Sequence, residues 1–320
     1  MDDVLIGIRA IHLAATVMLA GAIFFQLLVA EPAFQTSNAA PSIVTAMRAW
    51  QARLMWITLA VGIVSGAAWL VEIAAIISGQ TRFEALSNGT AWTVATETQF
   101  GHAWTIRLVA AVFLAGWLPV FAATDTASLS HWRWVPLGVA GCFVGAIAWA
   151  GHSGATPGRT GDLQLASDVV HLLAAAAWVG GLVPLAILLA FARRAANEQA
   201  AGLAAGVAYR FSTLGIASVG GLLATGLVNS WALAGSVRAF VETDYGRLLL
   251  LKIILFAVML VLAIVNRLRL LPRVRDVGAM SQLQRNSLTE AVLGVMVIVI
   301  VGALGTIEPA IHAMHAPHVH

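Results

Sequence analysis

The sequence predicts an all-α integral membrane protein, from its composition and from the pattern of its apolar residues. Of 320 residues, 60% are hydrophobic and only 10% are charged, and the mean hydropathy is +0.87. A soluble domain carries about 25% charged residues. The apolar residues also form continuous runs of about 20, the length that an α-helix needs to cross a bilayer. A β-barrel would show shorter alternating segments instead.

Eight apolar runs predict eight transmembrane helices. They cover residues 4–30, 54–78, 103–123, 134–150, 165–192, 210–233, 246–268 and 288–308. Arginines concentrate in four of the connections, as Arg48 and Arg53, Arg133, Arg193 with Arg194 and Arg210, and Arg267, Arg269, Arg273, Arg275 and Arg285. By the positive-inside rule these connections face the cytoplasm, so we expect both termini outside.

Two stretches from the beginning of the chain recur further along it. "RAIHLAATVMLAG" (9–21) aligns with "DVVHLLAAAAWVG" (168–180), and "FGHAWTIRL" (100–108) aligns with "YGRLLLLKI" (245–253). The paired residues are Arg9 with Asp168, His12 with His171, Gly21 with Gly180, and Arg107 with Lys252.

This alignment predicts the parallel duplication of a four-helix unit. We call residues 1–150 the first half and residues 151–309 the second half, which are followed by a His/Met-rich tail at 310–320.

Histidines concentrate on the outer side of the predicted topology. They are His12, His102, His152 and His171. Ionisable groups at membrane depth are costly unless they are paired or line a cavity, which makes them functional candidates. Asp168 lies three residues before His171, so the two share a helix face, as do Arg9 and His12. Trp178, seven residues beyond His171, lies on that face too.

One interpretation of these residues is a metal site near the outer surface. His12 and His171 would form its core, with His152 and His102 nearby, because imidazole suits copper, zinc, nickel and iron. Asp168 would orient a histidine or bind the metal itself.

The other interpretation is a buried Arg9–Asp168 salt bridge between the halves, with the histidines as ordinary interior groups. This salt bridge could also support a metal site, with Trp178 as a further neighbour.

The tail offers a second place for a metal. It holds His312, Met314, His315, His318 and His320. Short His-rich tracts bind metals, so a tail outside the membrane could gather copper or zinc at the entrance. The alternative is a tail with incidental metal affinity.

The remaining intramembrane polar residues are typical of structural pairs. We expect Glu72 or Glu308 to pair with Arg107 or Lys252, and Glu290 with the Asn266–Arg267 pair to tie the last two helices together. The sequence contains no phosphate-binding loop, nucleophile elbow or HExxH motif, so no enzyme activity is predicted. Basic residues in a membrane protein report topology, and no nucleic-acid partner is expected.

Several motifs make the chain resemble the copper resistance protein D family. They are "GH" (151–152), "HLLAAAAWVGGL" (171–182), "FS" (211–212), "TG" (225–226), "YGRLLLLK" (245–252), "NR" (266–267) with Pro272, and Glu290. The resemblance implies a bacterial inner-membrane protein of copper homeostasis that transports Cu(I) or Cu(II). It also implies a soluble periplasmic copper-binding partner, because this chain has no such domain of its own.

Three functions therefore stay open from the sequence. The first is copper transport or import through the His12/His171 region. The second is electron transfer by a membrane protein with haem b, since paired histidines on facing helices serve as axial ligands. The third is a copper-binding assembly factor that transports nothing.

Overall fold

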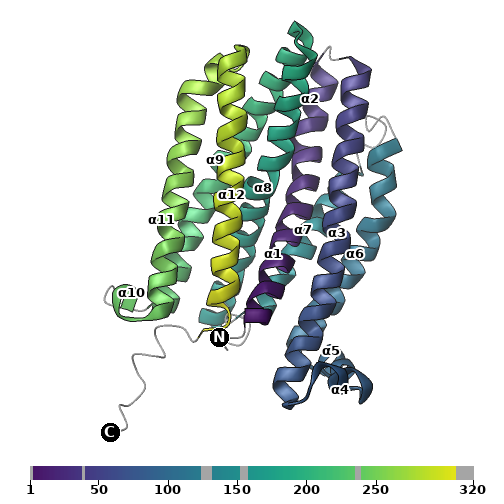
Figure 1. Cartoon of the computed structure of the whole chain (residues 1–320), viewed down its shortest axis with the longest axis vertical. Helices are drawn as coiled ribbons and strands as arrows, with labels where there is room; N and C mark the ends of the chain where they lie inside the picture. The colour runs from purple at the N-terminus through teal and green to yellow at the C-terminus, as the bar shows by residue number, and fades with distance from the viewer. Residues whose placement is uncertain (1–2, 38–39, 124–131, 152–157, 235–238, 308–320) are drawn as a thin grey trace.

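The computed structural model describes residues 3–37, 40–123, 132–151, 158–234 and 239–307. Its long helices lie side by side in one bundle (Figure 1). These are α1 (Asp3–Phe24), α3 (Pro41–Ser78), α6 (Gln99–Ala123), α7 (Trp134–Gly145), α8 (Arg159–Ala195), α9 (Glu198–Ala234), α11 (Asp244–Val265) and α12 (Val277–Leu304). Short helices α2 (Glu31–Thr36), α4 (Arg82–Ser87), α5 (Thr90–Glu97) and α10 (Ala239–Glu242) lie at the two ends of the bundle.

Seven described helical segments are long and apolar enough to cross a membrane, which makes this a multi-pass membrane protein. They are Asp3–Thr36, Pro41–Ser78, Gln99–Val120, Arg159–Ala195, Glu198–Ser230, Asp244–Arg273 and Val277–Leu304. The run expected at 134–150 forms a shorter apolar helix, Trp134–Ala150, whose last five residues tighten into a 3₁₀ helix. The predicted count of eight spans is therefore not confirmed.

Three helices begin well before their apolar runs. α3 begins at Pro41, α9 at Glu198 and α12 at Val277, each at least ten residues earlier than expected. Hydropathy marks only the part of a helix that faces lipid, whereas the helix itself continues back to a capping residue. Pro41 is at the first position of α3, and the Asn197 side chain accepts the Ala200 backbone N–H at the start of α9, at 2.8 Å.

The centre of the bundle is the crossing of α1 and α8. In the most apolar stretch of each segment, 83% of the α1 residues and 61% of the α8 residues are buried, against 11% for α11. Gly21 and Gly180 lie at this crossing, where a Cβ on Gly21 would be 2.4 Å from the Gly180 Cα. Small residues allow such backbone contact between membrane helices. Large apolar side chains on α3, α6, α9 and α11 point outward instead, as a lipid-facing surface requires.

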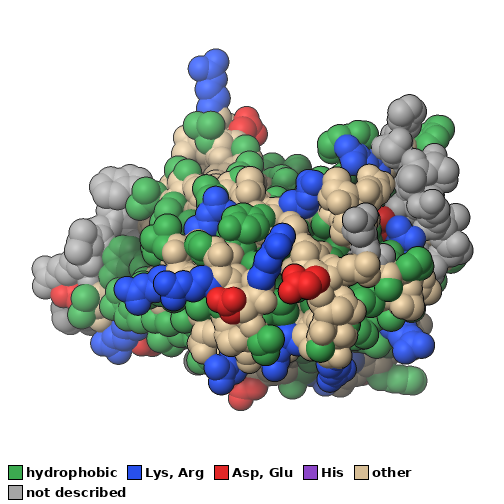
Figure 2. Space-filling model, turned by 90° about the horizontal axis from the view of Figure 1, so that it is seen from above, with side chains coloured by type: hydrophobic (Ala, Val, Ile, Leu, Met, Phe, Trp, Pro, Cys, Tyr) green, Lys and Arg blue, Asp and Glu red, His purple; other side chains and the backbone are tan. Residues whose placement is uncertain are grey.

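The two ends of the bundle differ in charge. α1 begins and α12 ends at the same end, next to α4, α5 and α10 (Figure 1). The opposite end, which carries α2 and the arginine-containing connections, is called here the arginine-rich end. Figure 2 shows the basic side chains of this end, all of them arginines, spread over the face with fewer acidic ones. At this end Arg193 donates to Gln284 at 2.7 Å and joins α8 to α12.

A capping box begins α4. The Thr81 backbone N–H and hydroxyl donate to the Glu84 carboxylate at 2.9 and 2.8 Å, and these bonds hold the pKa of Glu84 below its ordinary value. A depressed carboxyl pKa means that the cap contributes above the unfolded pKa and is lost as pH falls through the folded one. We expect Thr81→Ala to raise the pKa of Glu84, measured by carboxyl NMR titration; an unchanged value would contradict the capping box.

Candidate metal-binding sites in the two halves

His12, on α1, is fully engaged by its neighbours. Its Nε2 faces Arg107 on α6, and an arginine can only donate, so Nε2 accepts. The ring therefore carries its proton on Nδ1, which donates to the Ser65 hydroxyl on α3 at 3.0 Å. The Ser65 hydroxyl in turn donates a hydrogen bond to the Val61 carbonyl, at 2.6 Å. Both ring nitrogens of His12 are thus occupied.

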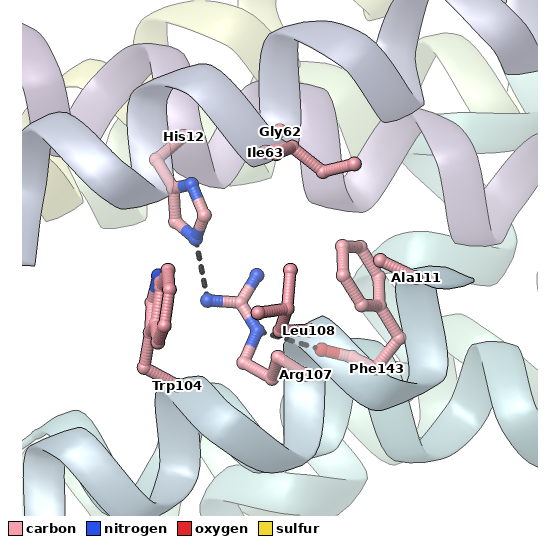
Figure 3. Close-up of a pocket in the computed structure, with 8 residues that line it drawn as sticks. All are labelled: His12, Gly62, Ile63, Trp104, Arg107, Leu108, Ala111 and Phe143. Atoms are coloured by element: carbon pink, nitrogen blue, oxygen red, sulfur yellow. Dashed lines mark hydrogen bonds between the residues drawn. The ribbon is translucent and has the colours of Figure 1, made fainter. Parts of the chain in front are cut away.

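Arg107 is buried and held from three sides. Its Nε donates to the Phe143 carbonyl at 3.0 Å and one terminal nitrogen to the Thr16 hydroxyl at 2.8 Å, while the other meets His12. The guanidinium also lies over the Phe143 ring, 4.9 Å from its centre. Figure 3 shows His12 and Arg107 facing each other beside Trp104, in the wall of a cavity of about 20 Å³. That volume is enough for about one water molecule.

The cations of the first half do not pair as the sequence predicted. Arg9 lies over the Trp69 ring, 4.8 Å from its centre, rather than against Asp168. Trp69 in turn packs edge-on against His12. Glu72 forms its ion pair with Arg82, at 2.5 Å, because the chain folds back after α3. The expected Arg9–Asp168 and Glu72–Arg107 pairs are therefore absent among the described residues.

His171, on α8, has one nitrogen available. Its Nδ1 lies 2.9 Å from the Thr225 hydroxyl on α9, and that hydroxyl donates to the Gly221 carbonyl at 2.6 Å. Thr225 must then accept from Nδ1–H, so the Nε2 of the neutral ring keeps its lone pair. The part of the chain that the structure describes offers no hydrogen-bond partner to this Nε2.

Charged groups of both signs surround His171. Asp168, one turn earlier on α8, accepts from the Asn229 amide at 2.6 Å. Lys252, on α11, is close enough to act electrostatically on both His171 and Asp168. Tyr245, at the start of α11, lies within electrostatic range of Asp168 as well. An imidazole nitrogen without a described hydrogen-bond partner, one helical turn from a carboxylate, offers ligand types that suit a metal cation.

The two environments correspond residue by residue. His12, Ser65 and Arg107 take the places that His171, Thr225 and Lys252 take in the second half. The sequence alignment missed the contribution of α3 and α9. The signal for it is "SGAAW" (65–69) beside "TGLVN" (225–229), which matches hydroxyl to hydroxyl and Gly66 to Gly226. Trp69 and Asn229, the contacts of Arg9 and Asp168, occupy the last position of each stretch.

The two histidines face different helices, however. His12 points to α3 and α6, and His171 to α9 and α11, so each half builds its own site. No three His, Cys, Asp or Glu side chains converge within the described ranges.

Of the other predicted ligands, His102 is the one that lies among the described residues, and it joins neither site. His102 is exposed and bonds the Thr96 carbonyl at 2.8 Å. His152 and the tail residues His312, Met314, His315, His318 and His320 lie outside the described residues.

Trp178 belongs to a different cluster, nearer the arginine-rich end. It packs edge-on against Phe256 and lies next to the Glu290 carboxyl group rather than next to His171. Asn266 donates to Glu290 at 2.6 Å, which confirms that this pair ties α12 to the end of α11. Arg267 donates to Ser212 on α9 instead, at 3.0 Å.

Comparison with known protein families assigns the chain. The profile of the copper resistance protein D-like N-terminal domain matches residues 1–162, and that of copper resistance protein D matches residues 205–304. The chain belongs to the copper resistance protein D family. His12 and Arg107 fall in the first matched range, Lys252 and Glu290 in the second, and His171 in the segment between them.

Relatives in this family come from several bacteria. The chain is 32% identical to inner membrane protein YebZ of Escherichia coli K12, over 68% of this chain and 72% of the relative. It is 28% identical to copper resistance protein D of Pseudomonas syringae pv. tomato, over 81% and 84%. It is 32% identical to copper transport protein CutJ of Bacillus subtilis 168, over 53% of this chain and 30% of that protein. No solved structure matches the chain.

Proposed function

We propose that this protein binds copper ions in the outer part of the bacterial inner membrane and carries them across it. The observation that carries the proposal is the Nε2 of His171, which has no hydrogen-bond partner among the described residues and lies one helical turn from Asp168, in a chain of the copper resistance family. Imidazole binds copper in either oxidation state. One relative is named as a copper transport protein and another as an inner membrane protein, which supports the same assignment.

The orientation follows from charge. The arginine-rich end faces the cytoplasm by the positive-inside rule, and the His171 site then lies in the outer part of the membrane. The tail, His152 and a soluble periplasmic protein are the proposed donors of copper to this site. The halves at 1–150 and 151–309 are proposed copies of one four-helix unit, supported by their matched histidine contacts and by the Gly21–Gly180 crossing.

A route toward the cytoplasm is available in the second half. On α8, Trp178 follows His171 by seven residues. On α11 and the turn after it, Lys252, Met259 and Asn266 are spaced by seven in the same way. Positions seven apart lie on one helix face. This face therefore carries Lys252 at the depth of His171, Asn266 near the arginine-rich end, and the Met259 thioether between them. Glu290, bonded to Asn266, ends the route at the inner level.

His171→Ala tests the copper site. We expect the variant to bind one copper atom per chain fewer. Removal of a supporting group lowers the metal affinity of a site by about 10–100-fold, so the loss of a ligand should lower the affinity for copper further than that. Copper content is measured on the purified full chain, and uptake of radioactive copper is measured in proteoliposomes.

His102→Ala is the matched control, because His102 bonds only a backbone carbonyl in the structure. It should bind and transport copper as the unmodified protein does. Copper binding and uptake that are unchanged in His171→Ala would overturn the proposal. Binding without uptake in the unmodified protein would identify an assembly factor instead.

A further inference from the structure

The two halves present opposite electrostatics to a cation. Around His12 the described charged groups are the guanidinium groups of Arg9 and Arg107, and neither forms an ion pair with a described residue. Glu72 does not neutralise them, because it is paired with Arg82. Around His171 the described charges are Asp168 and Lys252, one of each sign. A metal cation is therefore repelled by the first site and tolerated by the second.

Arg107 also forms a hydrogen bond with the His12 nitrogen that a metal would need as its ligand. The His12 Nε2 accepts from the guanidinium, and Nδ1 is committed to Ser65. The guanidinium is a planar fork with a fixed set of donors, and its bonds to Phe143 and Thr16 leave it little freedom to turn away. Lys252 is a single ammonium on a flexible stem, and it leaves the corresponding nitrogen of His171 without a hydrogen bond.

We infer that Arg107 acts as a built-in cation that closes the first site to copper, so that within the bundle copper binds only in the second half. The inference rests on the proposed copper function and adds the residue that determines which half binds. The cavity between His12, Trp104 and Arg107 supports it, because withdrawing the guanidinium would enlarge a space that now has room for about one water molecule (Figure 3).

The test removes the guanidinium and asks whether His12 gains copper. Arg107→Met and Arg107→Lys are each made in the unmodified chain and in His171→Ala, and Cu(I) bound per chain is measured by elemental analysis after gel filtration. We expect Arg107→Met to gain one copper atom per chain in both backgrounds, and the further change His12→Ala to abolish this gain. Arg107→Lys, which removes the guanidinium fork but keeps the positive charge, is expected to gain less copper than Arg107→Met.

Lys252→Met is the matched control in the second half. It should gain no copper atom, because the His171 Nε2 is already unoccupied. Arg107 variants that fold, by circular dichroism and gel filtration, but bind no more copper than their parents would overturn the inference. If His171→Ala loses no copper while Arg107→Met still gains a His12-dependent atom, the proposed function fails and the closing role of Arg107 stands.

A measurement on the unmodified protein decides the matter if the Arg107 variants do not fold. Diethyl pyrocarbonate modifies accessible imidazole nitrogens, and the modified peptides are quantified by mass spectrometry. Cu(I) is expected to slow modification of His171 severalfold, whereas His12, whose ring nitrogens are both hydrogen-bonded, should stay unmodified with or without Cu(I). Modification of His12 that Cu(I) slows as strongly as that of His171 would show that copper reaches His12 and would overturn the inference.

Discussion

Gly180→Ala is expected to destabilise the bundle by about 2 kcal/mol or more, although alanine is the better helix former. The new Cβ would lie 2.3 Å from the Val17 carbonyl oxygen and 2.8 Å from the Gly21 Cα. These are backbone atoms, so no rotamer change can move them, and α1 and α8 must separate by about 1 Å. Overpacking costs about 1–3 kcal/mol even where side chains can adjust, which exceeds the gain of about 0.5–1 kcal/mol in helix propensity.

Gly7→Ala and Gly206→Ala are the controls, because no heavy atom lies within 4 Å of a Cβ at either position. Each is expected to leave stability unchanged or to raise it by about 0.5–1 kcal/mol. The free energy of unfolding is measured for all three variants in mixed detergent micelles. A Gly180→Ala variant as stable as Gly7→Ala would contradict direct backbone contact between α1 and α8.

The sequence predicted most of the long apolar helices because apolar runs are a local pattern. The spacing of Arg9, His12 and Gly21 recurs at Asp168, His171 and Gly180, although Arg9 lies over the Trp69 ring while Asp168 accepts from Asn229. Gly21 and Gly180 even meet each other across the bundle centre. The missed match of Ser65 with Thr225 has a physical reason: α3 and α9 consist mostly of interchangeable apolar residues, which carry little alignment signal.

The direction in which a side chain points was not predictable in the same way. Helical spacing places His12 with Arg9, and His171 with Asp168, but it does not say which neighbouring helix each pair faces. That depends on how α1 and α8 are rotated at their crossing, and the rotation turns His12 and His171 toward different helices. Which ring nitrogen of each histidine is hydrogen-bonded is harder still to predict, because it depends on hydroxyls contributed by α3 and α9.

Glu290→Gln is expected to keep copper binding and to lower copper transport by about tenfold or more, a factor that corresponds to about 1.4 kcal/mol. Glu290 is 1% exposed, and it accepts the last hydrogen bond of a chain of side-chain amides. Gln282 donates to Asn286 at 2.8 Å, Asn286 to Asn266 at 2.7 Å, and Asn266 to Glu290 at 2.6 Å. The negative charge of a carboxylate in this position lowers the barrier to a passing cation, whereas a carboxamide carries no charge, so the barrier rises in the variant.

Glutamine has nearly the same size and can still accept from Asn266, so the link between α11 and α12 should survive the change. Glu198→Gln, an acid-to-amide change at the exposed start of α9, is the control and should transport at the unmodified rate. Copper per chain, thermal unfolding and uptake into proteoliposomes are measured together for both variants. Transport by Glu290→Gln at the unmodified rate would remove Glu290 from the route. Loss of copper binding as well would mean that the inner cluster supports the His171 site instead of following it.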